Sequence, residues 1–250
     1  LYQVATAGLS APDIAAPLRH ILRHQRNVTV LMAEVTGIDT VARCVHLGPD
    51  ALPYDFLVVA TGVTHAYFGR EDWRPFAPGL KTLADAFAIR ARMLSAFESA
   101  ERSTDPVERE RLMRFAVIGA GPTGVELAGT LAEIARHTLP REFRRIDPRQ
   151  ANIHLVEAGP RVLSAMPEVL SASARRQLER LGVQVHLGQP VTAIDAGGFV
   201  LGETRIEAGT ILWAAGVAAS PLGAGLPAER DRAGRVKVAP DLSVPGVPEV

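Results

Sequence analysis

A glycine-rich stretch near the middle of the chain has the residue types and spacing of a phosphate-binding loop. Its glycines follow the pattern Gly-x-Gly-x-x-Gly, and its six residues are Gly119, Ala120, Gly121, Pro122, Thr123 and Gly124. An apolar segment precedes the loop and a helical pattern follows it, which is the context of a dinucleotide-binding turn. In such a turn a pyrophosphate binds at the free N–H groups and positive dipole end of the helix. The stretch therefore predicts a dinucleotide site, with a tight turn that holds no ligand as the alternative.

Each residue type in this loop has a separate task. Gly119 allows the tight turn, Gly121 lets the backbone approach a pyrophosphate, and Gly124 lets the helix pack closely on the strand. Pro122 suits the first helical position because it has no N–H group to leave unpaired. The loop alone would be a weak signal among 22 glycines, and its context makes it strong.

Two carboxylates are candidates for contacts with the nucleotide. Glu157 ends the next expected strand, where a carboxylate accepts hydrogen bonds from a ribose and repels a 2′-phosphate, which favours NADH over NADPH. Arg161 lies close enough in the sequence to weaken that preference. Glu126 lies in the first turns of the helix after the loop, where the dipole stabilises an acid without any function. A position at the nicotinamide end of the site is the other interpretation of Glu126, and both stay open.

These residues need a parallel sheet to bring them together. The apolar runs 115–118 and 153–157 alternate with helical patterns over 125–138 and from about 168 to Gly182, and this alternation predicts a parallel α/β sheet. Upstream, Thr82 and Asp85 have the spacing of a capping box. They predict the start of another helix.

The chain also repeats itself in outline. Strand-like pieces over 28–35, 43–47 and 54–60 lead to Ala60-Thr61-Gly62, and further β-rich pieces lead to Ala214-Ala215-Gly216. The run 56–60 is apolar without alternation, so we expect a strand buried on both faces. Residues 10–26 are predicted to form an amphipathic helix. The repeat indicates two copies of one nucleotide-binding domain.

Composition excludes several other classes of protein. The 250 residues carry 27 basic and 27 acidic side chains, so a strongly basic nucleic-acid binder is excluded. With Cys44 as the single cysteine there is no disulfide, dithiol or Cys-rich zinc site, and we expect a small apolar side chain without a partner. His20 and His24 have no third ligand nearby, so no metal site is expected. The cysteine usage predicts a cytoplasmic protein. No transmembrane helix is predicted, because glycines and prolines interrupt the uncharged run 208–228.

Several stretches together resemble the type II, non-proton-pumping NADH dehydrogenases, which belong to the two-dinucleotide-binding-domain flavoproteins (pyridine nucleotide-disulfide oxidoreductase-like). The stretches are residues 1–8, 117–129 and 156–160 and the two strand ends 60–62 and 214–216. The resemblance implies an α/β fold with two Rossmann-like FAD- and NAD(P)-binding domains. Residues 1–83 and 217–250 would form an incomplete FAD domain, and the inserted residues 84–216 would form the NADH domain.

The resemblance also implies roles for single residues. The backbone of Val35 would bind the FAD adenine, Ala60, Thr61 and Gly62 would line the flavin, and Ala215 and Gly216 would lie near NADH. Glu126 would match the glutamate that the family places near the flavin and nicotinamide, where a role in proton or quinone handling is expected. It is the one residue that we would name as catalytic.

The implied function is transfer of a hydride from NADH to FAD and of electrons from FAD to a membrane quinone. The family's own FAD glycine loop, its later Gly-Asp strand end and its quinone and amphipathic membrane-anchor regions do not occur in these residues, so we expect a fragment that lacks both ends. The parent would lie in the cytoplasm against the inner face of the cell membrane, and a homodimer is compatible with the resemblance. Alternatives are an NADH-dependent reductase of a soluble carrier such as a ferredoxin or rubredoxin, and an NADH-binding fragment without activity.

Overall fold

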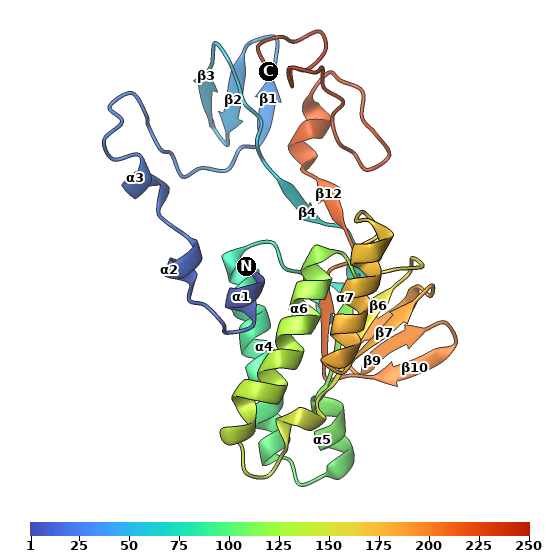
Figure 1. The fold of residues 1–250 in the computed structure, drawn as a ribbon. Helices are drawn as coiled ribbons and strands as arrows, with labels where there is room; N and C mark the ends of the chain where they lie inside the picture. Colours follow the sequence, from blue (N-terminus) through green and yellow to red (C-terminus); the bar gives the residue numbers. More distant parts are fainter. The chain divides into compact units, whose positions relative to one another are not determined.

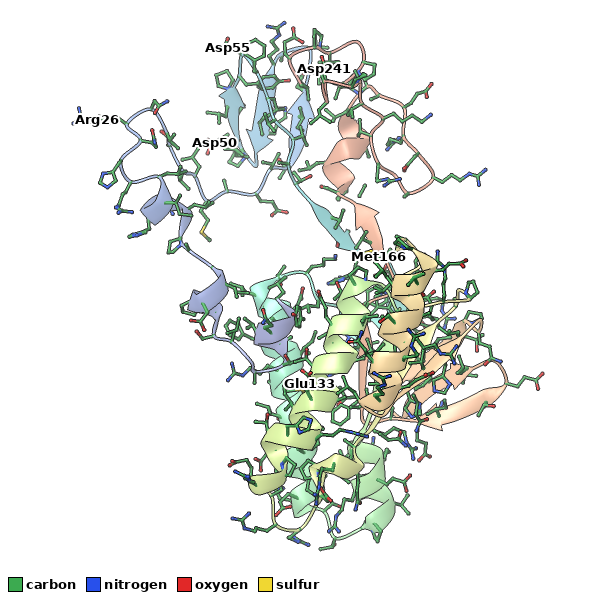
Figure 2. The ribbon with its side chains drawn as sticks, in the orientation of Figure 1. Arg26, Asp50, Asp55, Glu133, Met166 and Asp241 are labelled. Carbon is green, nitrogen blue, oxygen red and sulfur yellow. The ribbon has the colours of Figure 1, made fainter.

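The computed structural model describes all 250 residues, and they divide into two compact units. The first unit consists of Leu1–Ala15 and Tyr67–Gly216, and the second of Ala16–Ala66 and Val217–Val250. Figure 1 shows the elements of both units along the chain. Figure 2 adds the side chains, with Glu133 marking the end of helix α6 and Asp50 the start of strand β3.

A four-stranded parallel sheet forms the centre of the first unit. Its order is β11-β5-β6-β7, and its strands are β5 (Arg114–Ile118), β6 (Asn152–Glu157), β7 (Val183–Leu187) and β11 (Thr210–Trp213). β5 and β11 are buried along almost their whole length, because helices or a second sheet cover both faces. Helix α6 (Pro122–Glu133) connects β5 to β6, and α7 (Glu168–Arg180) connects β6 to β7.

Helix α4 (Leu83–Arg102) begins at the predicted capping box. The hydroxyl of Thr82 accepts a hydrogen bond from the amide of Asp85 at 3.1 Å, and the Asp85 carboxylate accepts one from the amide of Thr82 at 2.8 Å. The buried side of α4 includes Phe97, whose ring centroid lies 5.2 Å from that of Phe115 in β5. The short helices α1 (Tyr2–Ala5) and α5 (Pro106–Leu112) also contact α4.

An antiparallel meander accompanies the parallel sheet in the first unit. It consists of β8 (Val191–Asp195), β9 (Gly198–Leu201) and β10 (Thr204–Glu207). Phe199 of β9 packs in one apolar cluster with Val156 and Trp213 of the parallel sheet. The remaining short elements are η1 (Glu71–Trp73), the π-helical turn η2 (Ile134–Thr138), η3 (Leu139–Arg141) and η4 (Pro148–Gln150).

The second unit is built from short antiparallel elements. β1 (Gly37–Asp39), β2 (Cys44–Leu47) and β3 (Asp50–Pro53) form one sheet, and β4 (Val63–His65) pairs with β12 (Val217–Ala219). The 3₁₀ helix η5 (Pro221–Gly225) follows β12. The predicted α/β fold class with a parallel sheet is confirmed in the first unit, while the pairs in the second unit are antiparallel.

The expected helix over 10–26 is wrong. Only two one-turn helices form there, α2 (Ala11–Ile14) and α3 (Leu18–Ile21), and Pro17 stands between them. Proline removes a backbone donor and pushes the residue before it out of the helical region, and residues 15–17 are indeed non-helical, with Ala15 and Pro17 extended. The proline prevents a continuous helix, and neither short helix buries a side chain.

The strands expected over 28–35 and 54–60 are also absent. Neither segment pairs with any strand of the chain, and Phe56 and Val58 are 80% and 87% exposed. An apolar run becomes a buried parallel strand only where neighbours supply hydrogen bonds on both sides. The run around residue 57 makes a single such contact, from the amide of Leu57 to the carbonyl of Glu249 at 2.8 Å.

Candidate functional site

The glycine loop lies between β5 and α6, at the carboxyl edge of the parallel sheet. Gly119 adopts φ +102°, and a Cβ atom there would lie 2.4 Å from the Cα of Ala215. Only glycine combines this backbone angle with such a close approach of a second strand end. The amide of Gly119 donates to the carbonyl of Val156 at 2.7 Å, which ties the loop to β6.

The other two glycines differ in their surroundings. A Cβ atom on Gly124 would clash with the carbonyl oxygen of Gly119, so this glycine permits close packing of helix and strand. Gly121 is the N-cap of α6, and no atom lies within 4 Å of the place where its Cβ would be. Pro122 occupies the first helical turn. Open space at Gly121 is what a ligand needs in order to approach the helix N-terminus.

Glu157 is directly connected to this loop. One carboxylate oxygen accepts a hydrogen bond from the amide of Ala120 at 2.8 Å, and the other accepts one from the amide of Gly159 at 2.8 Å. A carboxylate has about four acceptor positions, so these two bonds fix its orientation and leave capacity for ribose hydroxyls. The structure thus brings Glu157 and the loop together, as the sequence pattern predicts.

The guanidinium of Arg161 is engaged elsewhere. It donates to the carbonyls of Met166 at 2.7 Å and Ser164 at 2.6 Å. These bonds close the turn before α7 and use two of the five N–H donors of the guanidinium. The effect of Glu157 and Arg161 on the choice between NADH and NADPH stays a prediction.

A cavity of about 540 Å³ opens beside the strand ends in the first unit. Its lining comes from the ends of β5, β6 and β11 and from the segment before α4: Tyr67, Phe68, Arg70, Trp73, Ile118, Gly119, Val156, Glu157, Ala158, Pro190, Val191, Thr192, Trp213 and Ala215. The carboxyl ends of parallel strands are where nucleotides bind in such sheets. Gly119, Glu157 and Ala215 are the sequence-predicted residues that this cavity brings together.

Neither Gly216 nor Glu126 belongs to the lining of this cavity. A Cβ atom on Gly216 would lie 2.5 Å from the Phe68 ring, so the glycine allows this aromatic side chain to lie against the strand end. Glu126 is exposed on α6 and does not belong to the cavity lining. The structure leaves both interpretations of Glu126 open.

The remaining predicted residues belong to the second unit. Ala60, Thr61 and Gly62 line a largely apolar cleft of about 800 Å³, together with residues from 219 to 250. Gly62 has φ +67°, and no atom lies within 4 Å of the place where its Cβ would be, so space remains above its backbone. Val35 is half-buried and is not part of this lining.

Comparison with known proteins decides the family. The model of the family described as pyridine nucleotide-disulphide oxidoreductase matches residues 1–250. The chain belongs to this family. The match covers both units, which agrees with the glycine loop and the carboxylate of Glu157 in the first.

Relatives of this oxidoreductase chain carry more specific names. It is 49% identical to the type II NADH:quinone oxidoreductases Ndh and NdhA of Mycobacterium tuberculosis, over the whole chain and 57% and 56% of those proteins. The NDH2 structure from Plasmodium falciparum in complex with NADH superposes with a TM-score of 0.88 at 22% identity, covering 99% of this chain and 54% of that one. The chain spans about half the length of the curated relatives it matches.

The sequence pattern of this oxidoreductase did not predict the aromatic wall of the cavity. Tyr67 stacks on Trp213 with ring centroids 5.0 Å apart, and Trp73 meets Trp213 edge-on at 5.7 Å. The hydroxyl of Tyr67 donates to the carbonyl of Ala77 at 2.7 Å, and burial raises the pKa of this phenol. The only signal in the sequence was four aromatic residues in the connector before α4, namely Tyr67, Phe68, Trp73 and Phe76.

A buried histidine pair in the first unit was also missed. His154 of β6 is 5% exposed, and its Nδ1 lies 3.0 Å from Nε2 of His186 in β7. Burial, with a smaller effect of the His186 charge, lowers the pKa of His154 to about 4. The signal was a polar residue in an otherwise apolar strand. No helix of the oxidoreductase is long and apolar enough to span a membrane.

Proposed function

We propose that the protein is a flavin-dependent NADH:quinone oxidoreductase, which takes a hydride from NADH and delivers electrons to a membrane quinone. The observation that carries the proposal is the glycine loop with the Glu157 carboxylate bonded to its Ala120 amide. The 49% identity to proteins named for this activity supports the same function.

The first unit is proposed to bind NADH. The N-terminus of α6 would receive the pyrophosphate over Gly121, and the carboxylate of Glu157 would accept hydrogen bonds from the adenosine ribose. Ala215 and Gly216 would place the nicotinamide next to Phe68. The carboxylate of Glu157 repels a 2′-phosphate, and two carbonyls accept hydrogen bonds from the guanidinium of Arg161. NADH is therefore the expected donor.

The second unit is proposed to bind FAD. The cleft beside Ala60, Thr61 and Gly62 is largely apolar, and the open space over Gly62 admits a flat ring system close to the backbone. Bound FAD supplies an acceptor for two electrons that can release them again to a quinone. The Val35 backbone would contact the adenine. Residues 1–83 and 217–250 are the proposed FAD domain, and residues 84–216 are the proposed NADH domain. Residues 1–15 and 67–83 of the proposed FAD domain lie in the first compact unit, so these bounds and the two units do not coincide.

The side chains of this chain position and shield the reactants. The loop and Glu157 orient the nucleotide, and the aromatic residues Phe68 and Trp213 keep water from that side of the cavity. Glu126 is the proposed catalytic residue, since a carboxylate near a cofactor can hold or release the proton that quinone reduction requires. Quinone as acceptor, contact with the inner face of the cell membrane and a homodimer complete the proposal for the whole protein.

Two results test this function separately. The purified protein should show flavin absorption bands that bleach when NADH is added without oxygen, and a short-chain quinone should restore them. Restoration by a ferredoxin and not by the quinone would support the soluble-carrier alternative. A colourless protein that binds NADH would contradict the flavin role and leave only nucleotide binding.

A variant of Gly121 tests the proposed NADH site directly. Gly121→Val places a branched side chain in the open space above the helix N-terminus and should weaken NADH binding about a hundredfold without unfolding the protein. Gly225→Val is the matched control, because that glycine also has open space around it and lies in the second unit. Unchanged NADH affinity in Gly121→Val would overturn the site.

A further inference from the structure

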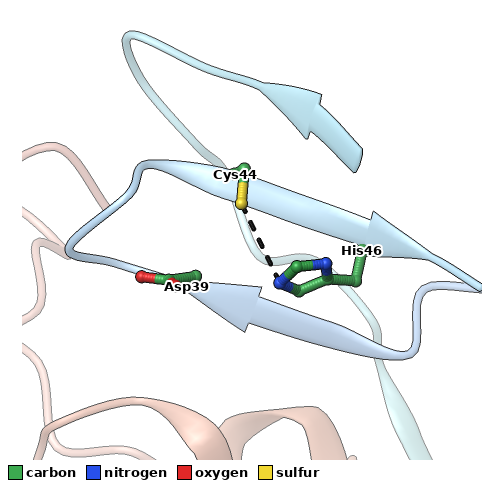
Figure 3. Close-up of side chains that lie close together, drawn as sticks. All are labelled: Asp39, Cys44 and His46. Atoms are coloured by element: carbon green, nitrogen blue, oxygen red, sulfur yellow. Dashed lines mark hydrogen bonds between the residues drawn. The ribbon is translucent and has the colours of Figure 1, made fainter. Parts of the chain in front are cut away.

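Three side chains of the kinds that ligate metals in proteins lie on one face of the β1–β2 hairpin in the second unit (Figure 3). Asp39 of β1 is the register partner of Cys44 in β2, and His46 lies two residues further along β2. Opposed residues and residues two apart point to the same side of a sheet. Oxygen, sulfur and nitrogen ligand atoms of the three therefore gather within 4.8 Å of one another.

The neighbours on this face leave room for an ion. Gly37 is the register partner of His46 on β1, and the imidazole Cδ2 lies 3.5 Å from where a Cβ of Gly37 would be. On β3 the partners of His46 and Cys44 are Ala51 and Pro53. These small or apolar residues neither compete for the ligand atoms nor neutralise the carboxylate of Asp39.

The carboxylate of Asp39 is held in place by the turn of the hairpin. Its Oδ1 accepts hydrogen bonds from the amides of Val41 at 2.9 Å and Ala42 at 2.8 Å. These two bonds fix the orientation of the carboxylate, and Oδ2 remains for a further contact. The Sγ of Cys44 already lies 3.9 Å from Nε2 of His46.

The distances suit a tetrahedral ion. Zinc lies about 2.3 Å from sulfur and about 2.0 Å from nitrogen, so two such ligands are roughly 3.5 Å apart in a tetrahedral site. The observed Sγ to Nε2 distance of 3.9 Å needs only a small rotation of the side chains to reach this value. A thiolate and an imidazole select zinc and its neighbours over magnesium or calcium.

We propose that Asp39, Cys44 and His46 bind one divalent transition-metal ion, and that Zn²⁺ is the ion they fit best. On binding, the Cys44 thiol releases its proton to solvent and the thiolate donates an electron pair to the ion, with no change of oxidation state. Water would complete the tetrahedron, as in zinc sites with three protein ligands. None of the three residues lines the cleft beside Ala60.

This inference departs from the expectation that the chain has no metal site. Cys44 does not stand alone, because the hairpin register brings a carboxylate across from it and a histidine beside it. The sequence separates Asp39 from Cys44 by four residues, and only a tight turn makes them neighbours.

Alkylation of Cys44 tests the site, because a metal-bound thiolate reacts slowly. Cys44 is the only cysteine of these 250 residues, and mass spectrometry of its peptide reports on it alone. With Zn²⁺ at one equivalent per chain, the rate of iodoacetamide labelling of the native protein should fall about tenfold or more, and a chelator should restore it. An equal rate with and without Zn²⁺ would overturn the proposal.

Two variants separate ligation from nonspecific protection. Asp39→Asn keeps an oxygen for the Val41 and Ala42 amides and so retains the turn, but its weaker ligand should remove most of the protection. His46→Asn should do the same. Asp50→Asn is the matched control, because this exposed carboxylate pairs with Leu47 in the same sheet and faces away from Cys44. Protection that survives both ligand variants, or that Asp50→Asn also removes, would overturn the site.

Discussion

Two segments of the chain share a sequence pattern and have different structures. Residues 57–62 and 212–216 are both apolar runs that end in a small residue and glycine. Leu212 and Trp213 belong to β11 and are each 4% exposed, whereas Val58 is 87% exposed and belongs to no strand. β11 is hydrogen-bonded to β5, and the earlier run has no parallel partner.

The difference shows that a buried parallel strand depends on its neighbours as much as on its own residues. A strand without a partner leaves its N–H and C=O groups unpaired. Burying its apolar side chains would also bury these polar groups, and that costs free energy. In the first unit, β5 pairs with β11 and helix α4 packs against it. The same local pattern in the second unit lines an open cleft.

The largest expected effect concerns two glycines with a positive φ, one in each unit. Gly119→Ala combines a positive φ with a methyl group 2.4 Å from the Cα of Ala215, and it should lower the free energy of unfolding by about 4 kcal/mol. Gly62→Ala has a positive φ without a close neighbour, and it should lower it by about 1 kcal/mol. Urea denaturation measures both, and equal effects would contradict the difference in packing.

Truncation of the two apolar runs should give the next largest difference. Leu212→Ala leaves a cavity in the core and should lower the free energy of unfolding by about 3 kcal/mol. Val58→Ala removes exposed methyl groups and should change it by less than about 0.5 kcal/mol. A large effect of Val58→Ala would show that residues 54–60 are buried in solution, and the comparison would then fail.

Local pattern predicted the first unit well because its interactions are close in sequence. The capping box of Thr82 and Asp85 spans four residues, and the glycine loop and the strand end at Glu157 belong to one βαβ unit. The expectations that were wrong concern segments whose structure depends on distant partners, or on a single residue that outweighs the local pattern. Residues 54–60 needed a partner strand, and Pro17 interrupts an otherwise helical spacing. The cluster of Asp39, Cys44 and His46 needed the hairpin register.

The pH dependence of stability should differ between the two units, because the buried histidine lies in the first. The folded pKa of His154 is about 4, below its ordinary value of 6.5, so the unfolded chain binds more protons between these values. Stability should therefore fall by about 2 kcal/mol as the pH drops from 6.5 to 4. In the His154→Leu variant, stability measured by thermal unfolding should depend much less on pH in this range. An unchanged pH dependence would assign it to other groups.

The smallest expected effect tests the contact that joins strand and loop in the first unit. Glu157→Gln keeps one acceptor oxygen for the Ala120 amide but replaces the other with a donor, which cannot accept from Gly159 or from a ribose hydroxyl. NADH affinity should fall about tenfold, which is about 1.4 kcal/mol, while NADPH affinity should fall less because the repelling charge is gone. Titration with both nucleotides measures the ratio. Equal losses for the two would mean that the Glu157 carboxylate only orients the loop and does not contact the ribose.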